Sequence, residues 1–211
     1  MAQSDIIVLD LETQKSFDEV GGRDHLHKLL VSVVGIYSYE KDQFITYTEP
    51  ELFHLFPVLE EARLIIGFNI KRFDFKVLEP YHHRSLTQLP ALDILEVVVK
   101  ILGHRLRLET LAQATLGRGK IGTGLDAIRY FQQGQLGKLK AYCLEDVKVT
   151  RDLYEYGKLH KKLFYYDRLG ETVLTFPVQW EDPSPRQATL RLTSDEGPVA
   201  SGHNQQPDSS H

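Results

Sequence analysis

Acidic side chains interrupt an apolar segment near the start of the chain. In residues 8–13, Val-Leu-Asp-Leu-Glu-Thr, Asp10 and Glu12 are two positions apart along a predicted strand, so they should project from the same face of it. Adjacent carboxylates repel each other unless one is protonated or a cation lies between them. The pair therefore indicates either a divalent metal site or a strand end that reaches solvent.

Three later residues have a similar character. Asp74 lies between two phenylalanines, which suits either a metal ligand or the N-cap of a helix. Tyr142 and Asp146 are four residues apart in a predicted long helix and should share one face, although a tyrosine at such spacing is also typical of a helix core. Carboxylates are the ligands that Mg²⁺ prefers, so the first hypothesis is a two-metal enzyme that cleaves phosphodiester bonds.

The elements that must position these residues alternate between strands and helices. Apolar runs and period-two patterns predict strands, and three- and four-residue spacing predicts helices. The predicted strands cover residues 6–11, 30–39, 43–48, 64–68 and 91–95, with a closing hairpin over 164–166 and 172–176. The predicted helices cover residues 50–61, 73–79, 96–102, 108–115, 125–132 and 136–163. This order predicts an α/β domain whose mixed sheet is antiparallel in its early hairpin and parallel afterwards.

Composition restricts the class of protein. With 211 residues, 42% of them hydrophobic and 26% charged, the chain is long enough for one globular domain, predicted over residues 1–180. Residues 181–211 are rich in Pro, Ser, Gln, Asp and Gly and are predicted to be a disordered tail. No apolar run approaches the ~20 residues of a membrane span, and the single cysteine, Cys143, predicts a cytoplasmic protein without an internal disulfide.

Positive charge is concentrated in the middle of a chain whose net charge is -4. Residues 100–140 contain eight Lys or Arg and two Asp or Glu, a local balance of +6, which suits a phosphate-backbone ligand but also a solvated helical face. Within this segment, the glycine-rich stretch 117–124 lacks the Gly-Lys-Ser/Thr ending of a phosphate loop and is predicted to be a flexible connector. Its cations, Arg118 and Lys120, are candidates for contact with a nucleic-acid backbone.

Taken together and in this order, the acidic segments resemble the three motifs of the DEDD superfamily of 3′–5′ exonucleases. Asp10 and Glu12 match an Asp-x-Glu-Thr motif on the opening strand, and Asp74 ends an Asn-x-x-x-Phe-Asp motif after a later strand. Asp146 ends a Tyr-x-x-x-Asp motif on a late helix, where Tyr142 in place of a histidine is typical of the DEDDy branch. That branch includes the proofreading domains of DNA polymerases and ribonuclease D.

The sequence around the acids narrows the resemblance. Residues 12–22 and 108–117 look closest to stand-alone predicted exonucleases that are similar to the family-B DNA polymerase exonuclease domain, and to the YprB-like group. The resemblance covers about residues 5–180. It implies a ribonuclease-H-like fold, with a mixed central sheet, flanking helices and the carboxylates gathered at one edge of the sheet.

The resemblance also implies a role for each residue. Asp10 would bind both of two Mg²⁺ or Mn²⁺ ions, Glu12 and Asp146 the ion that carries the attacking water, and Asp74 the second ion through a water. Tyr142 would orient the attacking water, since a group with a pKa of roughly 10 is a poor base at neutral pH. Secondary candidates for holding the terminal nucleotide are Asn69 and Phe68.

The leading hypothesis is a metal-dependent 3′–5′ exonuclease acting on single-stranded nucleic acid, with DNA preferred to RNA as the substrate. Two alternatives stay open. One is a ribonuclease-H-like endonuclease or an exoribonuclease that uses the same acids, and the other is a nucleic-acid-binding module that no longer cuts.

Overall fold

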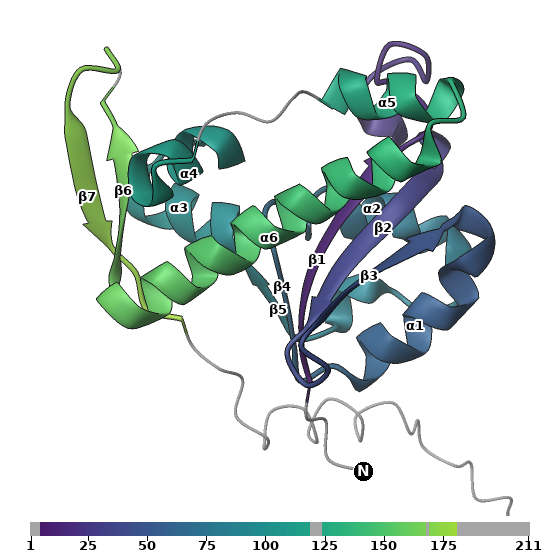
Figure 1. Ribbon diagram of the computed structural model, residues 1–211, viewed down its shortest axis with the longest axis horizontal. Helices are drawn as coiled ribbons and strands as arrows, with labels where there is room; N and C mark the ends of the chain where they lie inside the picture. Colours follow the sequence, from purple (N-terminus) through teal and green to yellow (C-terminus); the bar gives the residue numbers. More distant parts are fainter. Residues whose placement is uncertain (1–4, 119–123, 168, 181–211) are drawn as a thin grey trace, which may run out of the picture.

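The computed structural model describes residues 5–118, 124–167 and 169–180, and within them a five-stranded sheet forms the centre of the fold (Figure 1). Its strands lie in the order β3-β2-β1-β4-β5, with β1 in the middle. The pairs β1–β2 and β2–β3 are antiparallel, whereas β1–β4 and β4–β5 are parallel. The predicted mixed sheet with an early antiparallel hairpin is therefore confirmed. The strand bounds are β1 Ile6–Thr13, β2 Val31–Ser38, β3 Gln43–Thr48, β4 Leu64–Gly67 and β5 Ala91–Asp93.

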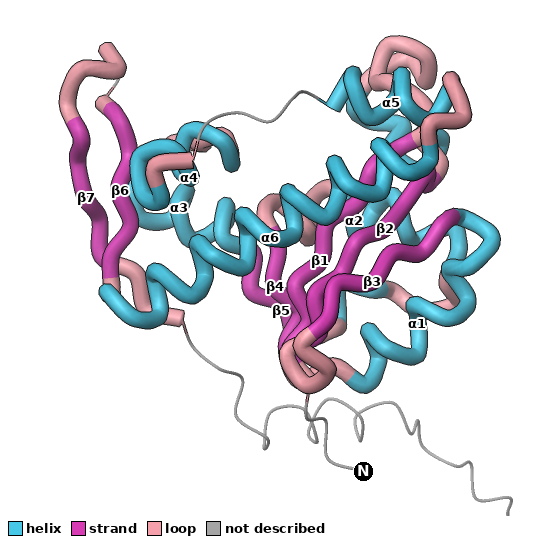
Figure 2. Tube along the Cα trace, viewed as in Figure 1, coloured by secondary structure: helices cyan, strands magenta, loops and turns pink. Residues whose placement is uncertain are grey.

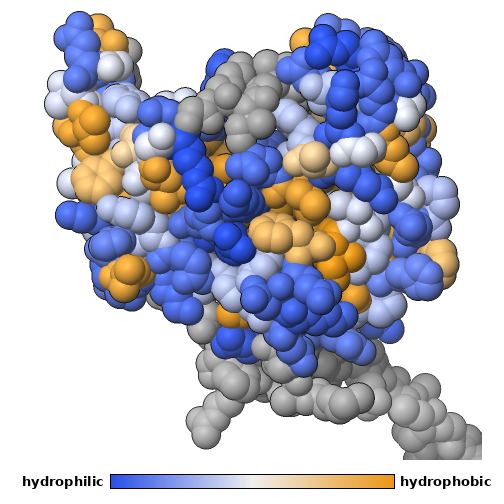
Figure 3. All heavy atoms as spheres, in the orientation of Figure 1, coloured by the Kyte–Doolittle hydropathy of each residue, from blue (hydrophilic) through white to orange (hydrophobic). Residues whose placement is uncertain are grey.

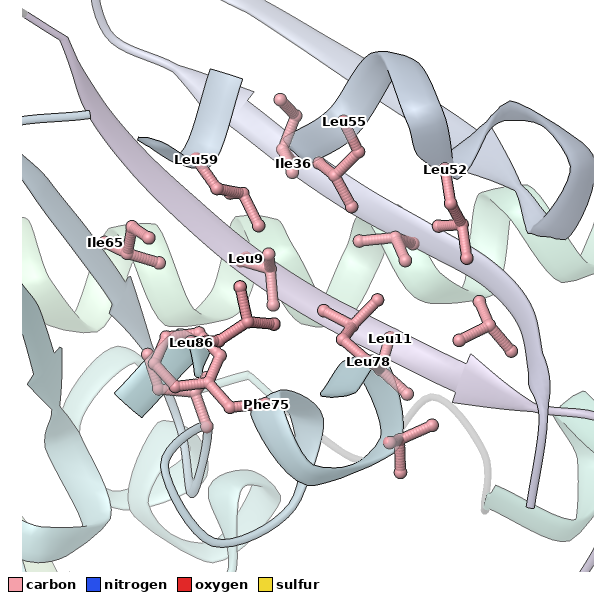
Figure 4. Packing of buried hydrophobic residues seen from close by; sticks show 14 of the residues in the cluster. Leu9, Leu11, Ile36, Leu52, Leu55, Leu59, Ile65, Phe75, Leu78 and Leu86 are labelled. Carbon is pink, nitrogen blue, oxygen red and sulfur yellow. The ribbon is translucent and has the colours of Figure 1, made fainter. Parts of the chain in front are cut away.

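Helices cover both faces of this sheet, as the tube in Figure 2 shows. On one face, α1 (Leu52–Glu61) and α2 (Asp74–Leu78) pack over a core of leucine, isoleucine and phenylalanine side chains (Figure 4). Across the other face runs the long helix α6 (Leu136–His160), together with α3 (Ile94–Leu102). The remaining helices, α4 (Leu108–Leu116) and α5 (Gly124–Gln132), pack beside α6.

The alternation of side chains along β1 sets the position of the two acids. Leu9 and Leu11 point into the core beneath α1 and α2. Val8, whose side chain points to the opposite face of the sheet, packs into the core that α6 covers. Because successive strand residues point to opposite faces, Asp10 and Glu12 continue the Val8 series onto the α6 face, where each is half-buried.

A separate two-stranded hairpin follows α6. It consists of β6 (Lys162–Tyr166) and β7 (Val173–Pro177), and it lies beside α4, where the Thr115 hydroxyl donates to the carbonyl of Phe164 at 3.0 Å. The predicted late hairpin is confirmed. The predicted helix end at residue 163 is wrong by three residues, because Lys161 adopts a left-handed conformation (φ 57°) that ends α6.

Short 3₁₀ segments account for other differences at the ends of elements. They are η1 Arg23–Lys28, η2 Glu49–Glu51, η3 Glu79–Tyr81 and η4 Leu86–Gln88. Helical structure continues past Pro80 after α2. Pro80 occupies one of the first two positions of η3, where the backbone N–H that proline lacks is not needed for a hydrogen bond within the helix. No helix in the described ranges is long and apolar enough to cross a membrane.

Candidate metal centre

Three of the predicted carboxylates meet at one point. Asp10 and Glu12 from β1 and Asp146 from α6 each offer a carboxylate oxygen, and these oxygens lie within 4.8 Å of one another. In the part of the chain that the structure describes, no Lys, Arg or His forms an ion pair with any of the three. Half-buried oxygen ligands without a counter-charge match the ligand preference of Mg²⁺ or Mn²⁺.

A glycine allows α6 to lie close enough to complete this group. Gly35 on β2 is paired directly with Asp10 on β1. A Cβ atom added at Gly35 would be 2.9 Å from Cys143 Sγ and 3.0 Å from Val147 Cγ2, both on α6. Across the same contact, the Cys143 thiol donates to the backbone carbonyl of Asp10 at 3.5 Å. The close approach of helix to sheet therefore occurs at the strand pair that carries the first acid.

Burial and mutual repulsion disfavour the ionised forms of these acids. The pKa of Asp10 is raised well above its ordinary value by burial and then by the charges of Asp146, Asp74 and Glu12. The pKa of Glu12 is raised by burial, Asp146 and Asp74. For Asp146, burial followed by the charges of Glu109 and Glu145 raises the pKa to about 6. A bound cation would reverse this repulsion.

Asp74 lies outside the group of three but is electrostatically coupled to it. It is the first residue of α2 and only 2% exposed, and no helix-capping bond is made by the N-cap residue, Phe73. Burial raises the pKa of Asp74 to about 8, although its own backbone N–H and that of Leu11 oppose this shift. Leu11 lies beyond the last β1 residue that pairs with β4. Among the described residues, Asp74 Oδ1 has no hydrogen-bond partner, so one buried oxygen is left for a ligand.

Tyr142 lies beside the same carboxylates. Burial and the charges of Asp146, Glu12 and Asp10, in that order, raise the pKa of its phenol. Within residues 5–118, 124–167 and 169–180, no group hydrogen-bonds its hydroxyl, while its ring packs against the cluster that contains Cys143. The hydroxyl therefore stays protonated at neutral pH.

Asp93 holds the loop between β4 and Asp74. It caps α3 by accepting from the N–H groups of Leu95 and Glu96, and it also accepts from the N–H groups of Asn69 (2.8 Å) and Lys71 (3.2 Å). It is 3% exposed. The loop is thus fixed to the end of β5.

Three of the four predicted substrate-binding residues lie in the part of the chain that the structure describes. Asn69 adopts a left-handed conformation (φ 70°), and its side-chain oxygen accepts from Arg105 Nη2 at 3.0 Å. Phe68 packs partly buried against the core beneath α3 and α6. Arg118 forms an ion pair with Asp152 of α6 at 2.5 Å. Lys120 lies outside the described residues.

Two residues that contribute to the site were not singled out for it in the sequence. Gly35 carried a usable signal, because a glycine inside an apolar strand often marks a close backbone approach. Glu109 lies in the first turn of α4 and affects the pKa of Asp146, although nothing in the local sequence indicates that α4 and α6 meet there.

Comparisons with known proteins agree with this arrangement. A family model described as the RNase H superfamily matches residues 9–157. Among solved structures, the family B DNA polymerase from the hyperthermophilic archaeon Pyrobaculum calidifontis is similar, with a TM-score of 0.55 and 16% sequence identity. The match covers 72% of this chain and 24% of the polymerase, so the similarity concerns one part of that enzyme and, at this identity, the fold alone. No curated protein matches the sequence.

Proposed function

Because the chain belongs to the RNase H superfamily, we propose that it is a nuclease, and more narrowly a metal-dependent 3′–5′ exonuclease acting on single-stranded nucleic acid. One observation carries the proposal: three carboxylate oxygens from β1 and α6 lie within 4.8 Å of one another with no ion-pair partner in the described residues. The similarity of the three acidic motifs to the DEDDy exonucleases supports the polarity of cleavage. The resemblance of residues 12–22 and 108–117 to relatives of the family-B DNA polymerase exonuclease domain supports a preference for DNA.

The residues fit a pair of Mg²⁺ or Mn²⁺ ions. Asp10, Glu12 and Asp146 would hold them directly, and Asp74 would contribute its unpartnered Oδ1, in agreement with the oxygen-only ligand set. When bound, the ions would lower the pKa of a water molecule and neutralise charge on the phosphate and the departing oxygen.

The protein's own groups account for the other requirements. The Tyr142 hydroxyl, kept protonated by its surroundings, would orient the attacking water by a hydrogen bond and would not act as a base. Phe68 and Asn69 follow the end of β4, where they would contact the terminal nucleotide. Since Asp93 fixes the backbone at Asn69, the position of that contact is set before substrate binds.

The proposal is tested by turnover on 5′-labelled single-stranded DNA and RNA oligomers with Mg²⁺ or Mn²⁺. The variants are Asp10→Asn and Asp146→Asn, with Asp18→Asn, an exposed acid, as the matched control. A ladder that shortens from the 3′ end is expected for the wild type and the control. Because metal-assisted charge stabilisation contributes several kcal/mol, each site variant should lose about 100-fold or more in rate.

A second measurement separates metal binding from catalysis. Mn²⁺ should raise the unfolding temperature of the wild type and of Asp18→Asn, and should do so far less for Asp10→Asn. Tyr142→Phe should retain the Mn²⁺ effect but cut more slowly. Internal cuts as the first products would favour an endonuclease, and an absence of metal-dependent cutting on both polymers would refute the nuclease proposal.

A further inference from the structure

A pocket separate from the carboxylates lies between the α3–α4 connection and the β6–β7 hairpin. Its volume is about 650 Å³, within the range of small-ligand sites. Most of its lining is aromatic or apolar and comes from His104, Leu106, Tyr165, Tyr166, Leu169 and Leu174. The hairpin that forms one wall stands beside α3 and α4 at the left of Figure 1.

Apolar side chains on this hairpin remain open to solvent. Leu169 is 79% exposed, Val173 50% and Leu174 39%, and Figure 3 shows apolar surface on the hairpin. One aromatic wall of the pocket is held in place, because the Tyr165 ring packs edge-on against Phe176 at 5.8 Å between centroids. Exposed apolar groups around an ordered aromatic ring indicate a binding surface.

Contacts link this pocket to the proposed catalytic site. Arg105 lies between His104 and Leu106 of the lining and donates to the side chain of Asn69, next to the proposed position of the terminal nucleotide. In the first turn of α4, Thr110 lines the pocket while the preceding Glu109 acts on Asp146. The first turn of α4 therefore contributes one residue to the pocket lining and one whose charge acts on Asp146.

The α3–α4 connection, which forms one side of the pocket, is positively charged. Residues 97–108 contain Lys100, Arg105 and Arg107 but no Asp or Glu. Within the described ranges none of the three cations forms an ion pair, and all three are exposed. The one acid of the lining, Asp167, is engaged at the hairpin turn, where it accepts from the N–H of Glu171 at 3.0 Å.

We propose that this pocket binds unpaired bases of a single nucleic-acid strand upstream of the 3′ end being cut. Bases would stack on Tyr165 and His104, whose ring centroids lie 6.4 Å apart. Arg105 and Arg107 would neutralise the phosphates that lead towards the carboxylates, the combination used by sequence-tolerant single-strand binders. The inference rests on the proposed function, because the nuclease assignment gives the strand its direction.

Binding without metal tests the pocket independently of cleavage. Fluorescence anisotropy of 5′-fluorescein-labelled (dT)₁₂ in EDTA compares the wild type with Tyr165→Leu, which keeps an apolar side chain against Phe176 but removes the ring. Its Kd should rise about tenfold because each stacked base contributes strongly. Tyr165→Phe should bind like the wild type, since it keeps the ring. The matched control is Phe53→Ala on α1, an aromatic residue that is 66% exposed on the opposite face of the sheet, and it should leave the Kd unchanged.

A charge variant tests the phosphate contact. Arg107→Gln should weaken (dT)₁₂ binding and reduce the slope of log Kd against log salt by about one. Lys41→Gln removes the same charge at the β2–β3 turn, at the far end of the sheet from Asp10, and should change neither quantity. Unfolding temperatures within a few degrees of the wild type should accompany each variant.

Cleavage of two substrates distinguishes this inference from the proposed function. Tyr165→Leu should raise KM for (dT)₁₂ at unchanged kcat and should leave hydrolysis of thymidine 5′-(p-nitrophenyl phosphate) unaffected, because that probe spans a single nucleotide. An unchanged Kd and KM for (dT)₁₂ in Tyr165→Leu, or no binding of (dT)₁₂ by the wild type, would overturn the inference. If the wild type binds (dT)₁₂ without cutting it and Tyr165→Leu loses this binding, the pocket is supported and only the nuclease proposal is refuted.

Discussion

Replacing Asp74 by asparagine should stabilise the metal-free protein at high pH. The Asp74 carboxyl is 2% exposed, has a pKa of about 8 against an ordinary 3.8, and leaves Oδ1 without a partner among the described residues. A carboxyl whose pKa is raised by folding binds more protons in the native state, so stability is lost as the pH rises from about 4 to about 8. Asparagine lacks this titration.

The size of the effect follows from the pKa. As the pH rises from 5 to 9, the wild type loses stability over roughly three pH units, from pH 5 to the Asp74 pKa of about 8. The free energy of unfolding falls by about 1.36 kcal/mol for each of these units. The advantage of Asp74→Asn over the wild type should therefore grow by about 4 kcal/mol. An unsatisfied amide in the variant costs about 1–3 kcal/mol, but at every pH, so it does not alter this difference. The Asp74 charge also raises the pKa of Asp10 and Glu12, which adds to the effect in the same direction.

Urea unfolding in EDTA at pH 5, 7 and 9 measures the effect. For a chain of this size, 1 kcal/mol corresponds to roughly 2–4 °C in Tm. In thermal unfolding, the difference in Tm between Asp74→Asn and the wild type should therefore change by about 10 °C over the same pH range. The exposed-acid variant Asp18→Asn should follow the wild type at each pH. A stability difference between Asp74→Asn and the wild type that stays constant from pH 5 to pH 9 would show that the side chain is not a buried, titrating carboxyl. Saturating Mg²⁺ at pH 8 should reduce the difference, because it stabilises the wild type more.

Three further substitutions test packing and hydrogen bonding, two of them near the site and one, Gly157→Ala, near the C-terminal end of α6. Gly35→Ala should cost about 1–3 kcal/mol of stability and lower kcat, because its Cβ would push α6 away from β1. The control Gly137→Ala, in α6 with open space around it, should be neutral or slightly stabilising in urea unfolding. Gly157→Ala should displace the ring of the chain's single tryptophan, Trp180, whose Cζ2 lies 2.6 Å from the added Cβ, and a red shift of its fluorescence at unchanged kcat would report this. Asp93→Ala removes the acceptor for four backbone N–H groups and should raise KM as well as lower stability by about 2–4 kcal/mol, with Asp93→Asn intermediate; equal KM values for all three would exclude a positioning role.

Local patterns predicted the fold and the faces on which the candidate acids lie. The two-residue spacing of Asp10 and Glu12 placed both on one strand face, and the four-residue spacing of Tyr142 and Asp146 placed both on one helix face. These periodicities depend only on the geometry of each element, so the sequence carries them. The meeting of three carboxylates from β1 and α6 agrees with the order of the motifs in the DEDD resemblance.

Features that depend on tertiary contacts were not predictable in the same way. The spacing of apolar residues continues from α6 into Leu163, yet that side chain belongs to β6, because pairing with β7 and the left-handed turn at Lys161 override the local pattern. Similarly, the predicted strand over residues 91–95 ends at Asp93, since its carboxylate caps α3 and starts the helix two residues early. Gly35 and Cys143 are 108 positions apart, and nothing local indicates that they touch.

The distance along the chain between β1 and α6 determines when the proposed metal centre can exist. During synthesis, β1 and β2 leave the ribosome long before α6, so a nascent chain ending near residue 135 has Asp10, Glu12 and Asp74 but lacks Asp146 and Tyr142. Such a chain also exposes the sheet face on which α6 packs. Metal affinity should therefore appear abruptly once α6 has docked, which makes the ion a reporter of the last stage of folding.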